Sequence, residues 1–187
     1  MPQLREHQLR VGGVVRLITN DHDSIVTALV HDMGNIVKFD LGKSGLAEDE
    51  LERWLAEQKQ TREMYGTEAH ETTYTMLKEV GMTKYVQYLK EEGKAYQWDD
   101  LDQEFFINLS KPALLTLYGD LRVGINGVTS IQGRIEDLER RYGAPRPESP
   151  WIEKLESYVQ TLTMMEIKNI REEMVVPLFD ELLTITV

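Results

Sequence analysis

The sequence predicts an all-α fold, a single helical bundle, and three observations support this prediction. Between Pro2 and Pro112 the chain contains no proline. Over the same stretch apolar residues recur at three- and four-residue spacings, which is typical of amphipathic helices. The chain has 187 residues, of which 41% are hydrophobic and 28% charged, so it is long enough to bury one core.

The first expected helix has an apolar face that also carries a histidine: Leu4, His7, Val11, Val14 and Ile18. Gly12 and Gly13 would weaken this helix in isolation, and either one can allow close contact with a neighbouring helix. Asp23 or Ser24 can cap a second helix, which we expect to carry the next histidine and to end near Gly34.

Further helical stretches are expected at 46–65, 67–81, 82–92, 98–109 and 131–142, and Ser110-Lys111-Pro112 should start the helix that bears Asp120. In the first of these, Leu51, Trp54 and Leu55 should face inward, and Gly124 to Gly127 should loosen the chain. Residues 143–150 hold three of the six prolines and are expected to form a linker between a domain at 1–142 and a helical extension at 151–187. The extension can pack back on the domain as a C-terminal helical appendage, or it can form a homodimer.

Composition limits the partners and the location. A net charge of −11 repels nucleic acid backbones, so a duplex partner is not expected, whereas a small anionic substrate is compatible with a local cation. The longest apolar run is far shorter than a membrane span, and Arg5 and Glu6 argue against a signal peptide. Because the chain has no cysteine, a reducing compartment, the cytoplasm, is the expectation.

Four residues suggest a metal site: His7, His31, Asp32 and Asp120. Adjacent residues on a helix point about 100° apart, so the His31-Asp32 pair needs ligands from other helices to enclose an ion. His7 and Asp120 both lie on apolar stripes, and a buried carboxylate such as Asp120 requires a cation, a salt bridge or protonation. Two imidazoles and two carboxylates suit one divalent Mn, Fe, Co, Ni or Zn ion better than calcium.

The segments around these residues are His7-Gln-Leu-Arg-Val11, Ala28-Leu-Val-His-Asp-Met-Gly34 and Leu117-Tyr-Gly-Asp-Leu-Arg-Val123. In order and spacing they resemble the motifs of the HD superfamily of metal-dependent phosphohydrolases, along most of residues 4 to 142. The resemblance implies an HD-domain helical bundle in which these four residues bind the metal. It also implies hydrolysis of a phosphate ester, with nucleotides the leading substrates, by a metal-activated water that Asp32 orients or deprotonates.

Two positions bear on how far the resemblance extends. Many members have a lysine where this chain has Asn35, and Lys38 one turn later is a candidate substitute. His70 resembles a histidine that some members use for a second metal, but no further histidine lies between His70 and Asp120. One ion is therefore the preferred number, with His70 in substrate contact or core packing as the alternative.

Cations near the site are candidates for binding the substrate's phosphate. Arg10, Lys38 and Arg122 could neutralise its charge, or each could form an ordinary surface salt bridge. The aromatic residues that could stack on a base, or fill the core instead, are Tyr65, Tyr74, Tyr96 and Trp98. Two other functions remain open: a non-catalytic sensor or scaffold that retains the metal, and an iron-dependent oxygenase of the same fold.

Overall fold

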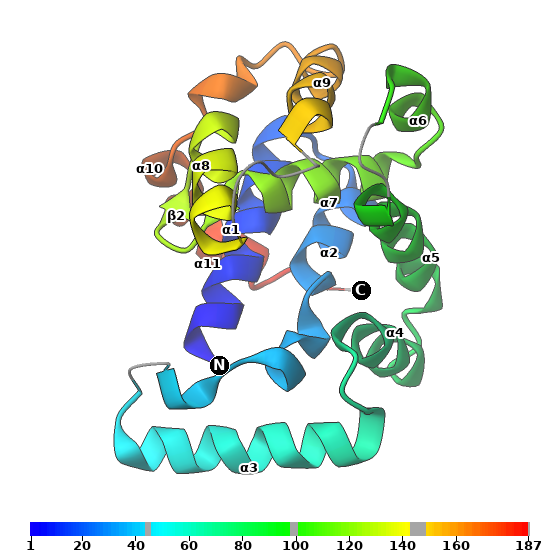
Figure 1. Cartoon of the computed structure of the whole chain (residues 1–187). Helices are drawn as coiled ribbons and strands as arrows, with labels where there is room; N and C mark the ends of the chain where they lie inside the picture. Colours follow the sequence, from blue (N-terminus) through cyan, green and yellow to red (C-terminus); the bar gives the residue numbers. More distant parts are fainter. Residues whose placement is uncertain (44–45, 98–100, 143–148, 187) are drawn as a thin grey trace.

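The structure is a computed structural model that describes residues 1–43, 46–97, 101–142 and 149–186. These residues are mostly helical, which confirms the all-α class (Figure 1). Within the described ranges the only sheet is an antiparallel hairpin of β1 (Val123–Gly124) and β2 (Gly127–Val128). The glycine-rich segment expected to loosen the chain thus forms a tight turn, for which Gly127 adopts φ +111°.

Three helices form the centre of the molecule: α1 (Pro2–Ile18), α2 (His22–Val30) and α7 (Lys111–Leu121). They approach closely because small residues stand at their contacts. A Cβ atom at Gly12 would lie 2.6 Å from the Leu29 side chain of α2, and one at Gly119 would lie 3.1 Å from Val11 of α1. The predicted close contact at Gly12 is confirmed, and it brings together the elements that carry the candidate metal ligands.

The second helix differs from the prediction at both ends. Its cap is Asp21, whose carboxylate accepts a hydrogen bond from the Ser24 amide at 2.9 Å, so the prediction of Asp23 or Ser24 is wrong. The helix ends at Val30 rather than near Gly34, and a turn leads into the 3₁₀ helix η1 (Met33–Lys38). The chain leaves the helix early because the Gly34 amide bonds to a side chain of another helix, the Thr73 hydroxyl at 2.8 Å.

Helices α3 (Glu48–Tyr65), α4 (Ala69–Glu79) and α5 (Thr83–Glu92) follow, and α3 lies along the lower edge of the molecule in Figure 1. Gly66 ends α3 with φ +92°. The helix rests on η1, on η2 (Leu41–Lys43) and on α4. Trp54 packs against this side as predicted, but Leu55 is 46% exposed, so its predicted inward position is wrong.

The helix expected at 98–109 is shorter than predicted. The structure has η3 (Gly93–Gln97) and α6 (Gln103–Ile107), while residues 98–100 lie outside the described ranges. The predicted helix that bears Asp120 and the one predicted at 131–142 are present as α7 and α8 (Ile131–Tyr142). The C-terminal elements are α9 (Ser149–Gln160), η4 (Ile167–Asn169), α10 (Glu172–Val175), η5 (Val176–Leu178) and α11 (Phe179–Leu182).

The C-terminal segment packs back on the rest of the chain. Trp151, Leu155, Ile170 and Val175 are fully buried in the same hydrophobic cluster as Leu115 of α7. Of the two roles considered for residues 151–187, packing on the domain is therefore what the structure shows for the described part. Most of the proposed linker, residues 143–148, lies outside the described ranges.

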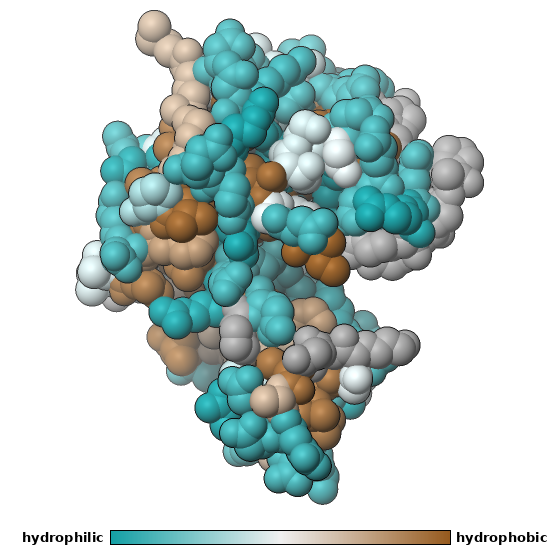
Figure 2. All heavy atoms as spheres, turned by 90° about the vertical axis from the view of Figure 1, so that its left-hand side faces the viewer, coloured by the Kyte–Doolittle hydropathy of each residue, from teal (hydrophilic) through white to brown (hydrophobic). Residues whose placement is uncertain are grey.

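The surface shown in Figure 2 is largely hydrophilic, and the apolar side chains on it form separate patches among polar ones. This agrees with a chain of net charge −11. Among the helices that the structure describes, none combines the length and apolar character needed to cross a membrane.

Candidate metal centre

Three of the four predicted ligands converge. His7 comes from α1, His31 from the C-terminal end of α2 and Asp120 from the last turn of α7. One donor atom of each lies within 4.8 Å of the others. The two imidazole Nε2 atoms are 3.3 Å apart, and Asp120 Oδ1 lies 3.1 Å from His7 Nε2 and 3.7 Å from His31 Nε2. This cluster could hold a metal ion.

The spacing of the donor atoms fits a shared ion. Ligands that each lie about 2.1 Å from one ion are separated by about 3.0 Å in octahedral and about 3.4 Å in tetrahedral coordination. The three separations between the donors, 3.3, 3.1 and 3.7 Å, lie close to these values. Two imidazoles and a carboxylate are also the donor types that borderline divalent ions bind.

Asp32 lies beside this cluster. Its Oδ2 atom is 3.6 Å from the Nε2 atom of both His7 and His31. The described three-residue cluster does not include it, so the fourth predicted ligand adjoins the donors rather than completing the set. Asp32 is 20% exposed, and its position directly after α2, in the turn before η1, lets its side chain face both histidines.

The local backbone fixes the orientation of His31. Its Nδ1–H group donates to the Ala28 carbonyl at 2.8 Å, which directs Nε2 towards the other ligands. The side chain is only 5% exposed, whereas those of His7 and Asp120 are 24% and 20% exposed. The centre is thus held from the protein side by a buried histidine and reached by solvent from the other side.

Without an ion, protons balance the charge of the centre. Burial lowers the pKa of His31, but the carboxylates of Asp32 and Asp120 outweigh burial and raise it to about 10. For Asp120, burial raises the pKa, yet the hydrogen bonds from His31 and His7 hold it well below its usual range. Protonated His31 therefore serves as a cation for the carboxylates, which is the role that a metal ion would take.

The sequence analysis missed Glu92, the last residue of α5. It is 8% exposed, and burial together with the charge of Asp120 raises its pKa from 4.5 to about 8. A signal was present in the sequence, since Glu92 continues at three-residue spacing the buried stripe of Val86 and Leu89. A glutamate on such a stripe is a buried carboxylate that needs an explanation.

Tyr96, considered above as a stacking residue, borders the centre. Although the residue is 41% exposed, its hydroxyl donates to Asp120 Oδ2 at 3.3 Å. Burial raises its pKa well above 10, Glu92 and Asp120 raise it further, and the positive charge of Arg134 opposes them. Its ring meets that of Trp151 edge-on, with the centroids 6.4 Å apart.

The three cations predicted to bind substrate do not gather around the centre. Arg10, one turn from His7, is paired with Glu172 at 2.7 Å and with Glu6 at 3.0 Å. Lys38 is exposed at the last residue of η1. The substrate-binding roles of Arg10 and Lys38 therefore stay predictions, and neither side chain has a described contact with the cluster.

Arg122 has a different role from the one predicted. It is 0% exposed and donates to the backbone carbonyls of Thr129, Ile167 and Ile170 and to the Tyr118 hydroxyl. These bonds tie α7 to the hairpin and to the C-terminal segment. Because the guanidinium is enclosed and its donors are used internally, Arg122 is in no position to contact a substrate, and its assignment as a substrate-binding residue is corrected here.

The two remaining candidates, His70 and Asn35, do not belong to the three-residue cluster. His70 is exposed in the first turn of α4, with its ring centroid 6.4 Å from that of Tyr74, and the described cluster does not include it. Asn35 is buried, and its backbone N–H donates to the Asp32 carbonyl at 2.9 Å. The Oδ1 atom of its side chain has no partner among the described residues.

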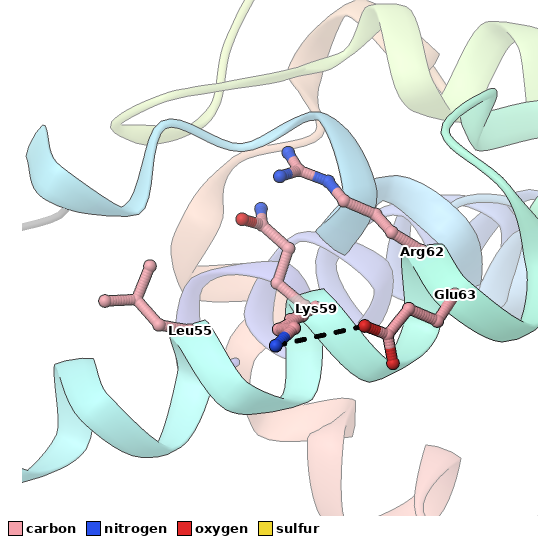
Figure 3. A pocket seen from close by; sticks show the side chains of 5 residues that line it. Leu55, Lys59, Arg62 and Glu63 are labelled. Atoms are coloured by element: carbon pink, nitrogen blue, oxygen red, sulfur yellow. Dashed lines mark ion pairs between the residues drawn. The ribbon is translucent and has the colours of Figure 1, made fainter.

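Two surface pockets lie away from the metal centre. The first, of about 350 Å³, is lined by residues of α3 alone, including Leu55, Lys59 and Arg62 (Figure 3). The Arg62 guanidinium there donates to the Val37 carbonyl, at 2.8 Å from Nε. The second, of about 420 Å³, lies between the start of α8 and α9. Neither contains a candidate ligand, so the chemistry of the cluster rather than the size of a pocket identifies the candidate site.

Comparison of the chain with protein-family models, with curated proteins and with solved structures finds no match.

Proposed function

We propose that this protein is a metal-dependent phosphohydrolase that cleaves a phosphate ester of a small molecule, with nucleotides as the leading class. The observation that supports the proposal is the convergence of His7, His31 and Asp120 from three helices, with donor spacings suited to one divalent ion. The order of these residues in the chain and the motifs around them resemble those of the HD superfamily, which adds the reaction class to the proposal.

The exposure of the ligands favours catalysis over a purely structural metal. A structural site is usually closed by protein ligands, whereas a catalytic site keeps a position open for water or substrate. His7, Asp32 and Asp120 are each 20–24% exposed, so the proposed ion would be accessible from solvent. When bound there, a divalent ion would lower the pKa of its water towards about 7 and polarise a phosphoryl oxygen.

Individual residues of the chain then have distinct roles in the proposal. His7, His31 and Asp120 hold the ion, and the Ala28 carbonyl keeps the His31 ring in the ligating orientation. Asp32, at 3.6 Å from both imidazoles, either completes the ligand set or accepts the proton of the attacking water. The Tyr96 hydroxyl holds Asp120 through its second carboxylate oxygen.

The test begins with metal content. The protein is stripped with a chelator, reloaded with Mn²⁺, Co²⁺ or Ni²⁺, and analysed for bound metal. We expect about one ion per chain in the wild type and a loss of metal in His31→Ala. His22→Ala is the matched control, because His22 is an exposed histidine at the first residue of α2, away from the cluster. Its ring lies 3.0 Å from the Thr186 carbonyl and 3.7 Å from Asp23 Oδ1. Equal metal content in all three proteins would contradict the proposed ligands.

Activity is then measured on phosphomonoesters and nucleotides. Asp32→Asn is expected to lower the rate of hydrolysis at least about 100-fold, because a proton acceptor or a ligand is lost. Its metal content separates these two roles, since a ligand loss also lowers occupancy. A loaded wild type that hydrolyses none of the substrates would refute the hydrolase proposal, and stable metal without hydrolysis would favour the scaffold. An Asp32→Asn variant with full activity would refute the role proposed for Asp32.

A further inference from the structure

Tyr96, in η3, is an exposed aromatic residue in direct contact with the metal centre. The residue is 41% exposed, and its hydroxyl donates to Asp120 Oδ2 at 3.3 Å. Among the phenylalanine, tyrosine and tryptophan residues whose exposure the structure describes, every other one is buried or half-buried. Within that part of the chain, the open aromatic side chain is thus the one that reaches a candidate ligand, beside any substrate that the ion would bind.

The other aromatic residues considered for base stacking do not share this position. Tyr74 is buried, with 7% of its surface exposed, and the Tyr65 hydroxyl donates to Glu79 at 2.8 Å. Trp98 lies outside the described ranges. Of the residues in that set, Tyr96 is therefore the one with a described contact to the centre.

The ring of Tyr96 is held in place before any ligand binds. Its neighbour Ala95 is fully buried in the main hydrophobic cluster, which anchors η3. The ring meets that of the fully buried Trp151 at an interplanar angle of 71°, with the centroids 6.4 Å apart. An edge contact of this kind occupies at most one face of the tyrosine ring. The tyrosine thus offers a fixed aromatic surface, held at its hydroxyl by Asp120.

The charge of the centre favours an uncharged contact for recognition of the substrate. Asp32 Oδ2 and Asp120 Oδ1 lie 3.6 and 3.7 Å from His31 Nε2, so two carboxylates face the place where a phosphate would bind. Arg10 is paired with two glutamates and Arg122 donates to carbonyls in the core, so neither is available to offset them. Stacking of a flat ring on a tyrosine requires no charge and tolerates different bases.

We propose that Tyr96 stacks on the base of a nucleoside phosphate, so that the protein prefers nucleotides to phosphate esters that lack a flat ring. This inference rests on the proposed function and assigns its substrate class to a residue outside the motifs. The proposed ion binds the phosphate, and Tyr96, in contact with the ligand Asp120, receives the leaving nucleoside. Most of a small ligand's affinity comes from such apolar and aromatic contacts, while a few polar groups fix its orientation.

The test compares two ligands, one with a base and one without. They are the phosphonate analogues of adenosine monophosphate and of ribose phosphate, in which a methylene group replaces the bridging ester oxygen and prevents hydrolysis. Their dissociation constants are measured by calorimetry on the Mn²⁺-loaded protein, and the metal content of each variant is measured alongside. The ratio of the two constants reports the contribution of the base, because effects on the metal or the phosphate cancel in it.

The wild type is expected to bind the adenosine analogue about tenfold to a hundredfold more tightly, which is the effect of one base–aromatic stack. Tyr96→Leu should abolish this preference, whereas Tyr96→Phe, which loses only the hydroxyl contact with Asp120, should keep it. Tyr88→Leu is the matched control, since the Tyr88 hydroxyl also lies near an aspartate, 3.4 Å from Asp23 Oδ2, but at the other end of α2. If Tyr96→Leu does not fold, nuclear Overhauser effects between the base and the Tyr96 ring in the Zn²⁺-loaded wild type serve as the test.

The outcomes separate this inference from the proposed function. A base preference that disappears in Tyr96→Leu, in a protein that hydrolyses no ester, would support the inference and refute the hydrolase. Hydrolysis of esters by a wild type that binds both analogues equally would refute the inference and leave the hydrolase intact. A preference that survives in Tyr96→Leu, or that is lost equally in Tyr96→Phe, would also overturn it, because the base would then bind elsewhere or the tyrosine would act only through Asp120.

Discussion

Replacement of Glu92 by glutamine should stabilise the metal-free protein at neutral and alkaline pH. The folded protein raises the pKa of Glu92 from 4.5 to about 8, mainly through burial, so folding favours the protonated carboxyl. Stability from this group is present below pH 4.5 and is lost as the pH rises to about 8. Each pH unit in this window costs about 1.4 kcal/mol, which gives a cost of about 3 kcal/mol at pH 7.

Glutamine has nearly the shape of the protonated carboxyl and cannot ionise. We therefore expect Glu92→Gln to match the wild type at pH 4.5 and to exceed its free energy of unfolding by at most about 3 kcal/mol at pH 7. The assay is urea denaturation of the chelator-treated proteins at several pH values. Glu71→Gln, a change at an exposed residue of α4, is the control and should have no such effect.

The pH dependence of the stability difference between Glu92→Gln and the wild type tests this explanation. A gain that is the same at pH 4.5 and pH 8, or a variant less stable than the wild type at pH 8, would refute the reasoning. The free energy of unfolding of the wild type should also continue to fall up to about pH 10. Protonated His31 contributes its full stabilisation below the unfolded pKa of 6.5, and this contribution is lost as the pH rises to about 10. That second decline should persist in Glu92→Gln.

Three further predictions concern the ligands and their support. Binding of one divalent ion at pH 7 should release about two protons, from His31 and Glu92. The release is measured by calorimetry in buffers of different ionisation enthalpy, and no release would contradict the raised pKa values of these two residues. Arg122→Met should destabilise the fold by about 3–5 kcal/mol in urea denaturation without changing the metal content of the folded protein, because buried carbonyls lose their donor. Gly34→Ala should lower the stability of the fold by about 1–3 kcal/mol and should also lower metal affinity, because the added Cβ would collide with the Ala69 carbonyl. A variant with wild-type metal affinity would show that the turn after Asp32 does not position the site.

Local patterns in the sequence predicted most helices because apolar spacing and helix-ending residues act within one helix. The glycine at the end of α3 and the proline at the start of α7 are such signals, and both helices are present. The end of α2 was mispredicted because a long-range bond decides it: the Gly34 amide bonds to Thr73, 39 residues away. No pattern confined to one helix contains that contact.

The same distinction applies to the site. His7, His31 and Asp120 could be predicted because each stands on an apolar stripe or in a motif. The cations could not, because proximity in sequence does not fix the direction of a long side chain. Arg122 is two residues from Asp120, yet it turns into the core and bonds to the Ile167 carbonyl, and Arg10, three residues from His7, pairs with Glu172.

The charges at the centre explain why a cation is expected there at all. At neutral pH the metal-free protein keeps a proton on His31, because the carboxylates of Asp32 and Asp120 outweigh the effect of burial on its pKa. It also keeps a proton on Glu92, mainly because that carboxyl is buried and also because Asp120 and Asp32 lie near it. A divalent ion supplies the same two positive charges in place of these protons and allows His31 to ligate through its free nitrogen. Competition between two protons and one ion is therefore built into this arrangement of side chains, and metal affinity should fall steeply as the pH is lowered.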